Sequence, residues 1–152
     1  LTEEKRKMLQ RIFAFGNTQV SAVMVPRDKI VCMDVNSPAE KVLSIFTEEG
    51  HSRIPVFENT PQNIIGIIYA QDLLHIWRNA ELIVLRDLIH TPYLIESTKK
   101  VSDLLQEFQK DQIQIAIIVD KAKNAVGLVT LEDLIEEIVG EIEEKVHFSK
   151  KK

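Results

Sequence analysis

Two residues near the end of the chain could bind a ligand, Thr130 and Asp133. An apolar stretch, residues 125–129, is followed by an amphipathic one, residues 131–139, so Thr130 is expected to open a helix directly after a buried strand. The hydroxyl of Thr130 and the free backbone N–H groups of a helix start can together bind a phosphate group. Asp133 lies one turn later, and its two carboxylate oxygens can accept hydrogen bonds from two neighbouring hydroxyls.

The same two residues also have a purely structural interpretation. A Thr-x-x-Asp pattern before an apolar helix is close to a capping box, in which the two side chains satisfy backbone N–H groups of the first turn. One threonine can serve both roles. The pattern at Thr130 and Asp133 therefore leaves ligand binding and helix capping open.

Other residues that could do chemistry are poorly placed for it. The histidines show no metal-ligand spacing and are expected to be surface or partly packed side chains: His51, His75, His90 and His147. No Ser-His-Asp, Cys-His or paired-carboxylate arrangement indicates catalysis. The acidic residues that follow Thr130, Glu132 among them, are expected to form a solvated helix face. We therefore expect a binding module, not an enzyme.

The stretch that contains Thr130 and Asp133 has a counterpart 61 residues earlier. G127-L-V-T-L-E-D133 corresponds to G66-I-I-Y-A-Q-D72, and apolar runs precede both. At an offset of 61 or 62, a one-residue slip being allowed, the matching pairs are Phe46 with Phe108, Val56 with Ile117, Gly66 with Gly127, and Asp72 with Asp133. Thr91-Pro92 likewise matches Val25-Pro26. The chain is therefore expected to be a duplication.

Each copy is expected to contain a strand, a helix, two strands and a second helix. In the first copy the strands are residues 30–35, 54–57 and 64–69, with helices from Ser37-Pro38 and over 71–77 and a polar loop over 58–63. In the second copy the strands are residues 93–95, 115–119 and 125–129, with helices from Ser97-Thr98 and over 131–140. A further amphipathic helix, residues 1–15, precedes both copies.

Composition narrows the class of protein further. The chain has 152 residues, is 45% hydrophobic and carries a net charge of −4, which is typical of a soluble globular protein and gives no electrostatic footprint for nucleic acid. Units of about 60 residues are marginally stable alone, so the two copies are expected to pack on each other and to form clefts between them. We expect the chain to be a soluble piece of a longer protein.

Three longer motifs give the chain a family resemblance: M24-V-P-R27, G50-H-S-R-I-P-V-F57 and G127-L-V-T-L-E-D-L-I-E-E-I-V-G-E-I142. With the duplication, they resemble a tandem pair of CBS (cystathionine-β-synthase) domains, specifically the cytosolic module of CorC/HlyC (cyclin-M-like) transporters, which are linked to magnesium and cobalt efflux and were formerly described as haemolysin-like. The resemblance implies an α/β (α+β) fold with two β-α-β-β-α repeats related by pseudo-twofold symmetry, which associate as a homodimer.

The resemblance also implies a ligand, an adenine nucleotide such as ATP or AMP, with Mg²⁺ as a candidate companion. Thr130 would then contact a phosphate and Asp133 the ribose, while the strand around Ile115 and Ala116 would hold the adenine and Arg53 would add a cation. The second copy of the site has Asp72, but Tyr69 replaces the threonine, so that cleft is a weaker candidate. The alternatives are a dimerisation module without ligand and a fragment of an enzyme whose catalytic residues lie elsewhere.

The expected domain organisation follows from the repeats and the resemblance. Residues 1–17 form a lead-in helix, 18–80 the first CBS repeat, 81–142 the second, and 143–152 a tail before a further domain. A membrane domain of the same full-length protein would precede the first residue. The module would lie at the cytoplasmic face of the inner membrane, with no nucleic-acid partner.

Overall fold

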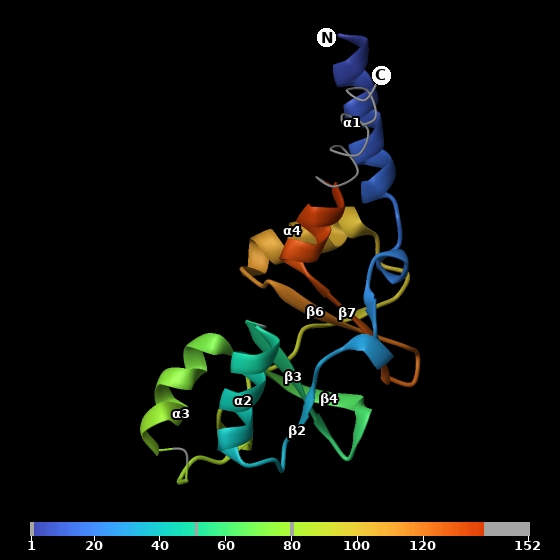
Figure 1. Cartoon of the computed structure of the whole chain (residues 1–152). Helices are drawn as coiled ribbons and strands as arrows, with labels where there is room; N and C mark the ends of the chain where they lie inside the picture. Colours follow the sequence, from blue (N-terminus) through green and yellow to red (C-terminus); the bar gives the residue numbers. More distant parts are fainter. Residues whose placement is uncertain (1, 51, 80, 139–152) are drawn as a thin grey trace.

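The computed structural model describes residues 2–50, 52–79 and 81–138. Its first element, α1 (Glu3–Gly16), projects away from a body made of two layered units (Figure 1). The hydroxyl of Thr2 accepts a hydrogen bond from the Lys5 backbone N–H at 3.3 Å, so Thr2 caps the predicted N-terminal helix. None of the described α1 residues is buried.

The first repeat forms a three-stranded sheet covered on one side by helices. β2 (Met33–Asp34) runs parallel to β3 (Arg53–Glu58), and β3 pairs antiparallel with β4 (Thr60–Tyr69). The covering helices are α2 (Ala39–Glu49) and α3 (Leu73–Asn79), which follows the short 3₁₀ turn Ala70–Asp72 (Figure 1). The polar loop predicted over residues 58–63 was wrong, because Asn59 adopts φ of 70° and turns the chain at once into β4.

The second repeat forms a four-stranded sheet in the order β1-β7-β6-β5. Its strands are β1 (Val25–Pro26), β5 (Leu94–Glu96), β6 (Ile115–Val119) and β7 (Ala125–Thr130), and the last two confirm the predicted strands. α4 (Val101–Asp111) and the helical residues 131–138 cover this sheet, with Leu104, Phe108 and Leu134 buried beneath them. The α/β fold with one sheet per repeat is thus confirmed.

α2 and α4 begin later than the predicted starts at Ser37-Pro38 and Ser97-Thr98. The N-cap positions are Pro38 and Lys100, and no described side chain makes a capping hydrogen bond at either. At α4 a tertiary contact replaces the cap, because the backbone N–H of Val101 donates to the carbonyl of Thr18 at 2.9 Å. The first turn of α4 is therefore satisfied by a segment 83 positions away in the sequence, Thr18 to Val101.

Each repeat begins by pairing with the last strand of the other repeat. β1 pairs antiparallel with β7, so Val25 lies opposite Leu128, and in the same way His90 lies opposite Ile67 of β4. The repeated glycines make room for these crossings. A Cβ atom at Gly66 would lie 2.6 Å from the Cβ of Ile89, and one at Gly127 would lie 2.8 Å from the Cγ of Met24.

The strand register corrects two of the predicted pairs between the copies. Val56 faces Gly66, and the residue that faces Gly127 is Ile118, so Val56 corresponds to Ile118 and not to Ile117. The crossing residues correspond as Val25 with His90 and not with Thr91. The number of positions between corresponding residues is 62 from β3 to β6 and 61 from β4 to β7. The one-residue slip that the sequence allowed therefore lies between the last two strands of each repeat.

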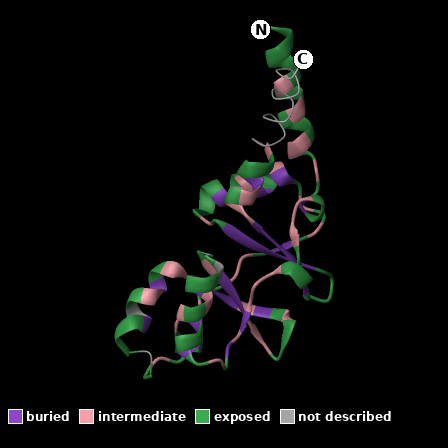
Figure 2. Ribbon diagram, in the orientation of Figure 1, coloured by how far each residue is buried: buried purple, intermediate pink, exposed green. Residues whose placement is uncertain are grey.

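The two repeats pack through the faces of their sheets that point away from the helices. The buried strands meet in the middle of the body (Figure 2), and the cluster between them consists of Ile64, Ile67, Ile115, Ile117, Val119, Ala125 and Leu128. Within the described ranges, no helix has the length and apolar character needed to cross a bilayer. The two sheets therefore pack face to face, and cavities form between the repeats.

Candidate functional site

A cavity of about 410 Å³ lies between the two repeats at the start of the helix that follows β7. Both repeats contribute to its lining, and so does the crossing segment, which is the stretch of the first repeat that starts at Val25, where the chain crosses β7. The lining comprises Val25, Lys29, Ile30, Val31, Gly50, Ser52, Arg53, Pro55, Ile115, Leu128, Thr130, Glu132 and Asp133. Four of the six predicted site residues line this one cavity: Arg53, Ile115, Thr130 and Asp133.

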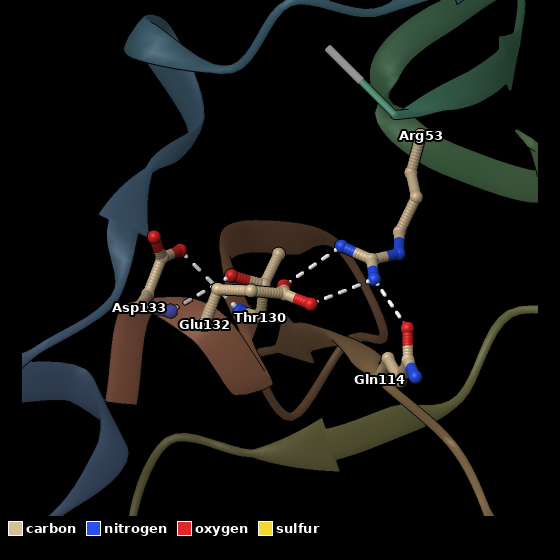
Figure 3. Close-up of polar contacts among 5 residues, drawn as sticks. All are labelled: Arg53, Gln114, Thr130, Glu132 and Asp133. Carbon is tan, nitrogen blue, oxygen red and sulfur yellow. Dashed lines mark hydrogen bonds and ion pairs between the residues drawn. The ribbon is translucent and has the colours of Figure 1, made fainter. Parts of the chain in front are cut away.

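Thr130 and Asp133 form the predicted capping box (Figure 3). The backbone N–H of Asp133 donates to Thr130 Oγ1 at 3.1 Å, and the backbone N–H of Thr130 points to Asp133 Oδ2 at 3.4 Å. Within the described part of the chain, no hydrogen bond is made to Asp133 Oδ1. The two residues therefore do cap the helix, and the capping leaves one carboxylate oxygen of Asp133 and one lone pair of the Thr130 hydroxyl.

Arg53 reaches this site from the first repeat. Its guanidinium donates to both carboxylate oxygens of Glu132, at 2.8 and 2.9 Å, and also to the side-chain carbonyl of Gln114 (Figure 3). The Arg53 side chain is only 14% exposed, whereas the Glu132 side chain is 59% exposed. Hydrogen bonds from Arg53 hold the pKa of Glu132 below its ordinary value, although burial acts in the opposite direction.

Glu132 is exposed, as expected for a solvated helix face, but the sequence did not indicate its partner. Its carboxylate joins the two repeats through Arg53, a residue 79 positions earlier in the chain. Gln114 is the other site residue that the sequence did not indicate, and a single polar side chain next to a strand carries no distinguishing signal. For Glu132 the available signal was its place between Thr130 and Asp133.

Ile115 and Ala116 lie on opposite faces of β6, because successive strand residues point to opposite sides. Ile115 faces the inter-repeat cluster and lines the cavity. Ala116 is completely buried against the helices of the second repeat. The side chain of Ala116 is therefore not brought to the site, and only its backbone lies in the strand that forms the cavity wall.

A second cavity, of about 450 Å³, occupies the position related by the pseudo-twofold symmetry. Its described lining residues are all uncharged: Ile67, Tyr69, Gln71, Thr91, Pro92, Tyr93, Gln112, Ile113, Gln114 and Ile115. By strand register, Tyr69 stands where the first cavity has Thr130, and Ile115 stands where it has Arg53. At these two positions the second cavity thus has neither the small hydroxyl nor the cation.

Asp72 is not among the residues that line the second cavity. It is buried, one carboxylate oxygen accepts the Tyr69 backbone N–H at 2.8 Å, and His90 Nε2 lies 3.2 and 3.3 Å from the two oxygens. His90 holds the position that Val25 holds beside Asp133. The expectation that His90 is a partly packed histidine is thus refined to a specific contact with Asp72.

Comparison with protein families gives one match that repeats along the chain. The CBS domain family matches residues 20–79 and again residues 85–140. Among curated proteins, the chain is 33% identical over 146 residues to the magnesium and cobalt efflux protein CorC of Salmonella typhimurium and 32% identical to that of Escherichia coli. Each alignment covers 95% of this chain and 50% of the relative, so the chain spans about half the length of these relatives.

Solved structures show the same relationship. The CBS domain of a bacterial CNNM/CorC family Mg²⁺ transporter superposes with a TM-score of 0.84 at 32% identity, over 92% of this chain and 86% of that chain. The same kind of domain in complex with ATP gives a TM-score of 0.83 at 32% identity, over 90% and 98%. A CBS-domain pair with bound AMP from Klebsiella pneumoniae gives 0.68 at 27%, over 80% and 98%. The CorC relatives are efflux proteins, and the first of these structures is a CBS domain of a transporter, not an enzyme.

Proposed function

Because this chain belongs to the CBS-domain family, as a tandem pair homologous to the CBS modules of CorC/CNNM transporters, we propose that it binds an adenine nucleotide between its repeats. The observation that carries the proposal is the convergence of Thr130, Asp133, Arg53 and Ile115 on one cavity. Related CBS domains solved with ATP and with AMP support the choice of ligand class.

The lining residues of the cavity offer a suitable partner to each part of a nucleotide. Thr130, at the helix start, offers a hydroxyl to a phosphate, and Arg53 offers a guanidinium. Asp133 Oδ1 can accept a ribose hydroxyl. Val25, Ile30, Ile115 and Leu128 offer apolar surface to the adenine, and a volume of about 410 Å³ lies within the range of small-molecule sites. Mg²⁺ would accompany the phosphates as part of the ligand.

The cavity next to Asp72 is the weaker nucleotide site in this proposal. Its aspartate is already engaged by His90, Tyr69 takes the position of Thr130, and no arginine is among the described residues that line the cavity. A ribose would have to displace the histidine, and the phosphates would find no charged partner among the described lining residues. We therefore propose one principal nucleotide per chain, at Thr130 and Asp133.

Nucleotide binding would act on the contact between the repeats. Arg53 of the first repeat is held by Glu132 of the second. A phosphate that engages Arg53 competes with Glu132, so binding favours a different arrangement of the two repeats. We propose that this change is passed to a membrane transport domain of the same full-length protein, with residues 18–80 and 81–142 as the two repeats at the cytoplasmic face of the inner membrane.

We further propose that the module works as a homodimer. Leu74 and Trp77 on α3 are 78% and 79% exposed, and Ile135, the counterpart of Leu74 at an offset of 61, is 49% exposed. Leu74 and Trp77 are three residues apart on α3 and so share one side of that helix, and large exposed apolar side chains of this kind mark an interaction surface. The competing candidate function is a dimerisation module without ligand, which the complete Thr130–Asp133 capping box favours.

Isothermal titration calorimetry with ATP, ADP and AMP, each with and without Mg²⁺, tests the proposal. The informative variant is Asp133→Asn, because an asparagine oxygen can still accept the Thr130 N–H but the side chain loses an acceptor for ribose. We expect wild-type binding and at least a tenfold loss in Asp133→Asn at unchanged thermal stability. Wild-type chain that binds no nucleotide at millimolar concentration would leave the dimerisation module as the function.

A further inference from the structure

The crossing segment of the first repeat is three residues longer than that of the second. Val25 corresponds to His90, and Met33 corresponds to Ile95. Eight positions separate Val25 from Met33 in the first repeat, whereas five separate His90 from Ile95 in the second. The extra length contains the 3₁₀ turn Arg27–Lys29. The two cavities thus differ in the backbone of one wall as well as in side chains.

The longer segment brings a cation to the Thr130–Asp133 cavity. Lys29, Ile30 and Val31 line that cavity, whereas the shorter segment contributes only uncharged Thr91, Pro92 and Tyr93 to the other. Lys29 is exposed, and it makes no ion pair with any residue in the described part of the chain. Its ammonium is therefore available to a ligand at no cost in broken contacts.

The other charges of the cavity are arranged differently. Arg53 already donates two hydrogen bonds to Glu132 and one to Gln114, so a phosphate must compete for it. Together the lining holds two cations, Lys29 and Arg53, and two carboxylates, Glu132 and Asp133. A ligand with several phosphates adds more negative charge than a monophosphate to a cavity that is balanced before it binds.

We propose that Lys29 is a specificity-determining residue that makes the cavity prefer nucleoside triphosphates over monophosphates. This inference rests on the proposed function, since it concerns which adenine nucleotide the same cavity selects. A lysine on an exposed turn interacts as a flexible point charge, so it adds affinity for additional phosphoryl groups without fixing the position of the first. Lys29 is a binding residue, and none of the ion pairs in the described part of the chain involves it.

The test compares dissociation constants for ATP and AMP in the full chain, by calorimetry at low and high salt. We expect Lys29→Met to weaken ATP about tenfold and AMP less than twofold. Lys29→Arg should restore the preference for ATP, and Lys121→Met, an exposed lysine on the turn between β6 and β7, should change neither constant. The loss in Lys29→Met should shrink at high salt, because it is electrostatic.

The outcomes separate the two proposals. If wild type binds neither nucleotide, the proposed function fails and this inference fails with it. If wild type binds nucleotide but Lys29→Met leaves the ratio of the ATP and AMP constants unchanged, only the inference is overturned. An equal loss for both nucleotides would also overturn it, since Lys29 would then contact the part that the two ligands share. Thermal unfolding of each variant checks that the fold is retained.

Discussion

The guanidinium of Arg53 and the carboxylate of Glu132 form an ion pair with two hydrogen bonds, 2.8 and 2.9 Å long, that joins the first repeat to the second. Arg53 begins β3, and Glu132 lies in the first turn of the helix after β7. Both residues line the cavity at Thr130. The pair is therefore at once a contact between the repeats and a competitor for any phosphate bound there.

Neutralising Glu132 is expected to strengthen nucleotide binding. In Glu132→Gln the phosphate no longer competes with a carboxylate for Arg53, so the affinity for ATP should rise roughly three- to tenfold, measured by calorimetry. The thermal stability should fall little, because an ion pair with one exposed partner contributes about 0–1 kcal/mol. Glu136→Gln, an exposed carboxylate on the same helix, is the matched control. Unchanged or weaker binding in Glu132→Gln would show that Glu132 does not compete.

The crossing of the chain at Gly66 is expected to be intolerant of any side chain. A Cβ there would lie 2.6 Å from the Cβ of Ile89, an atom that cannot move without its backbone, so Gly66→Ala should cost about 1–3 kcal/mol. Urea unfolding measures the loss. Ile89→Gly in the same chain removes the contacted atom, so the double variant should lose less than the sum of the two single variants. Strict additivity would contradict the proposed contact.

The Tyr93–Glu107–Lys99 network is expected to give stability a dependence on pH at both ends of the scale. Hydrogen bonding to Lys99 lowers the pKa of Glu107, so its contribution is present above pH 4.5 and is lost as the pH falls through the folded-state pKa. Burial, with the hydrogen bond to Glu107, raises the pKa of Tyr93 from 10 to about 12, so that contribution is lost as the pH rises through this window.

The variants Glu107→Gln and Tyr93→Phe separate these two limbs. Relative to wild type, Glu107→Gln should have a flatter loss of unfolding free energy below pH 4.5, and Tyr93→Phe a flatter loss between pH 10 and about 12. Urea unfolding across the pH range gives both comparisons. If the unfolding free energy of either variant depends on pH in the same way as that of wild type, the substituted residue does not cause the pH dependence.

Trp77 is expected to be an anchor of the homodimer. An exposed fraction of 79% is unusual for a tryptophan and shows that Trp77 is not a core residue. Trp77→Glu should weaken self-association at least tenfold in sedimentation equilibrium, because aromatic anchors dominate interface energies. Phe13→Glu, on α1 and 72% exposed, is the control that should leave dimerisation unchanged. A wild-type chain that is monomeric at all concentrations would contradict the dimer itself.

Several features of this protein could be predicted from short stretches of sequence. Thr2 caps α1, β6 and β7 occupy the predicted residues, and Thr130 with Asp133 closes the first turn of the last helix. All of these depend on residues within a few positions of one another. The duplication was visible for a similar reason, since two copies that bury the same faces repeat the same apolar spacing.

Other features depend on residues that are distant in the sequence, and local patterns carry no information about them. The start of α4 is set by the carbonyl of Thr18, and the glycine of each copy is needed because the opening segment of the other repeat crosses there. Likewise, the partner of Arg53 is known only once β3 and the last helix are packed together. Composition and periodicity describe which faces are apolar, but the packing of two such faces brings particular side chains into contact, and at Arg53 and Glu132 that packing builds the candidate site.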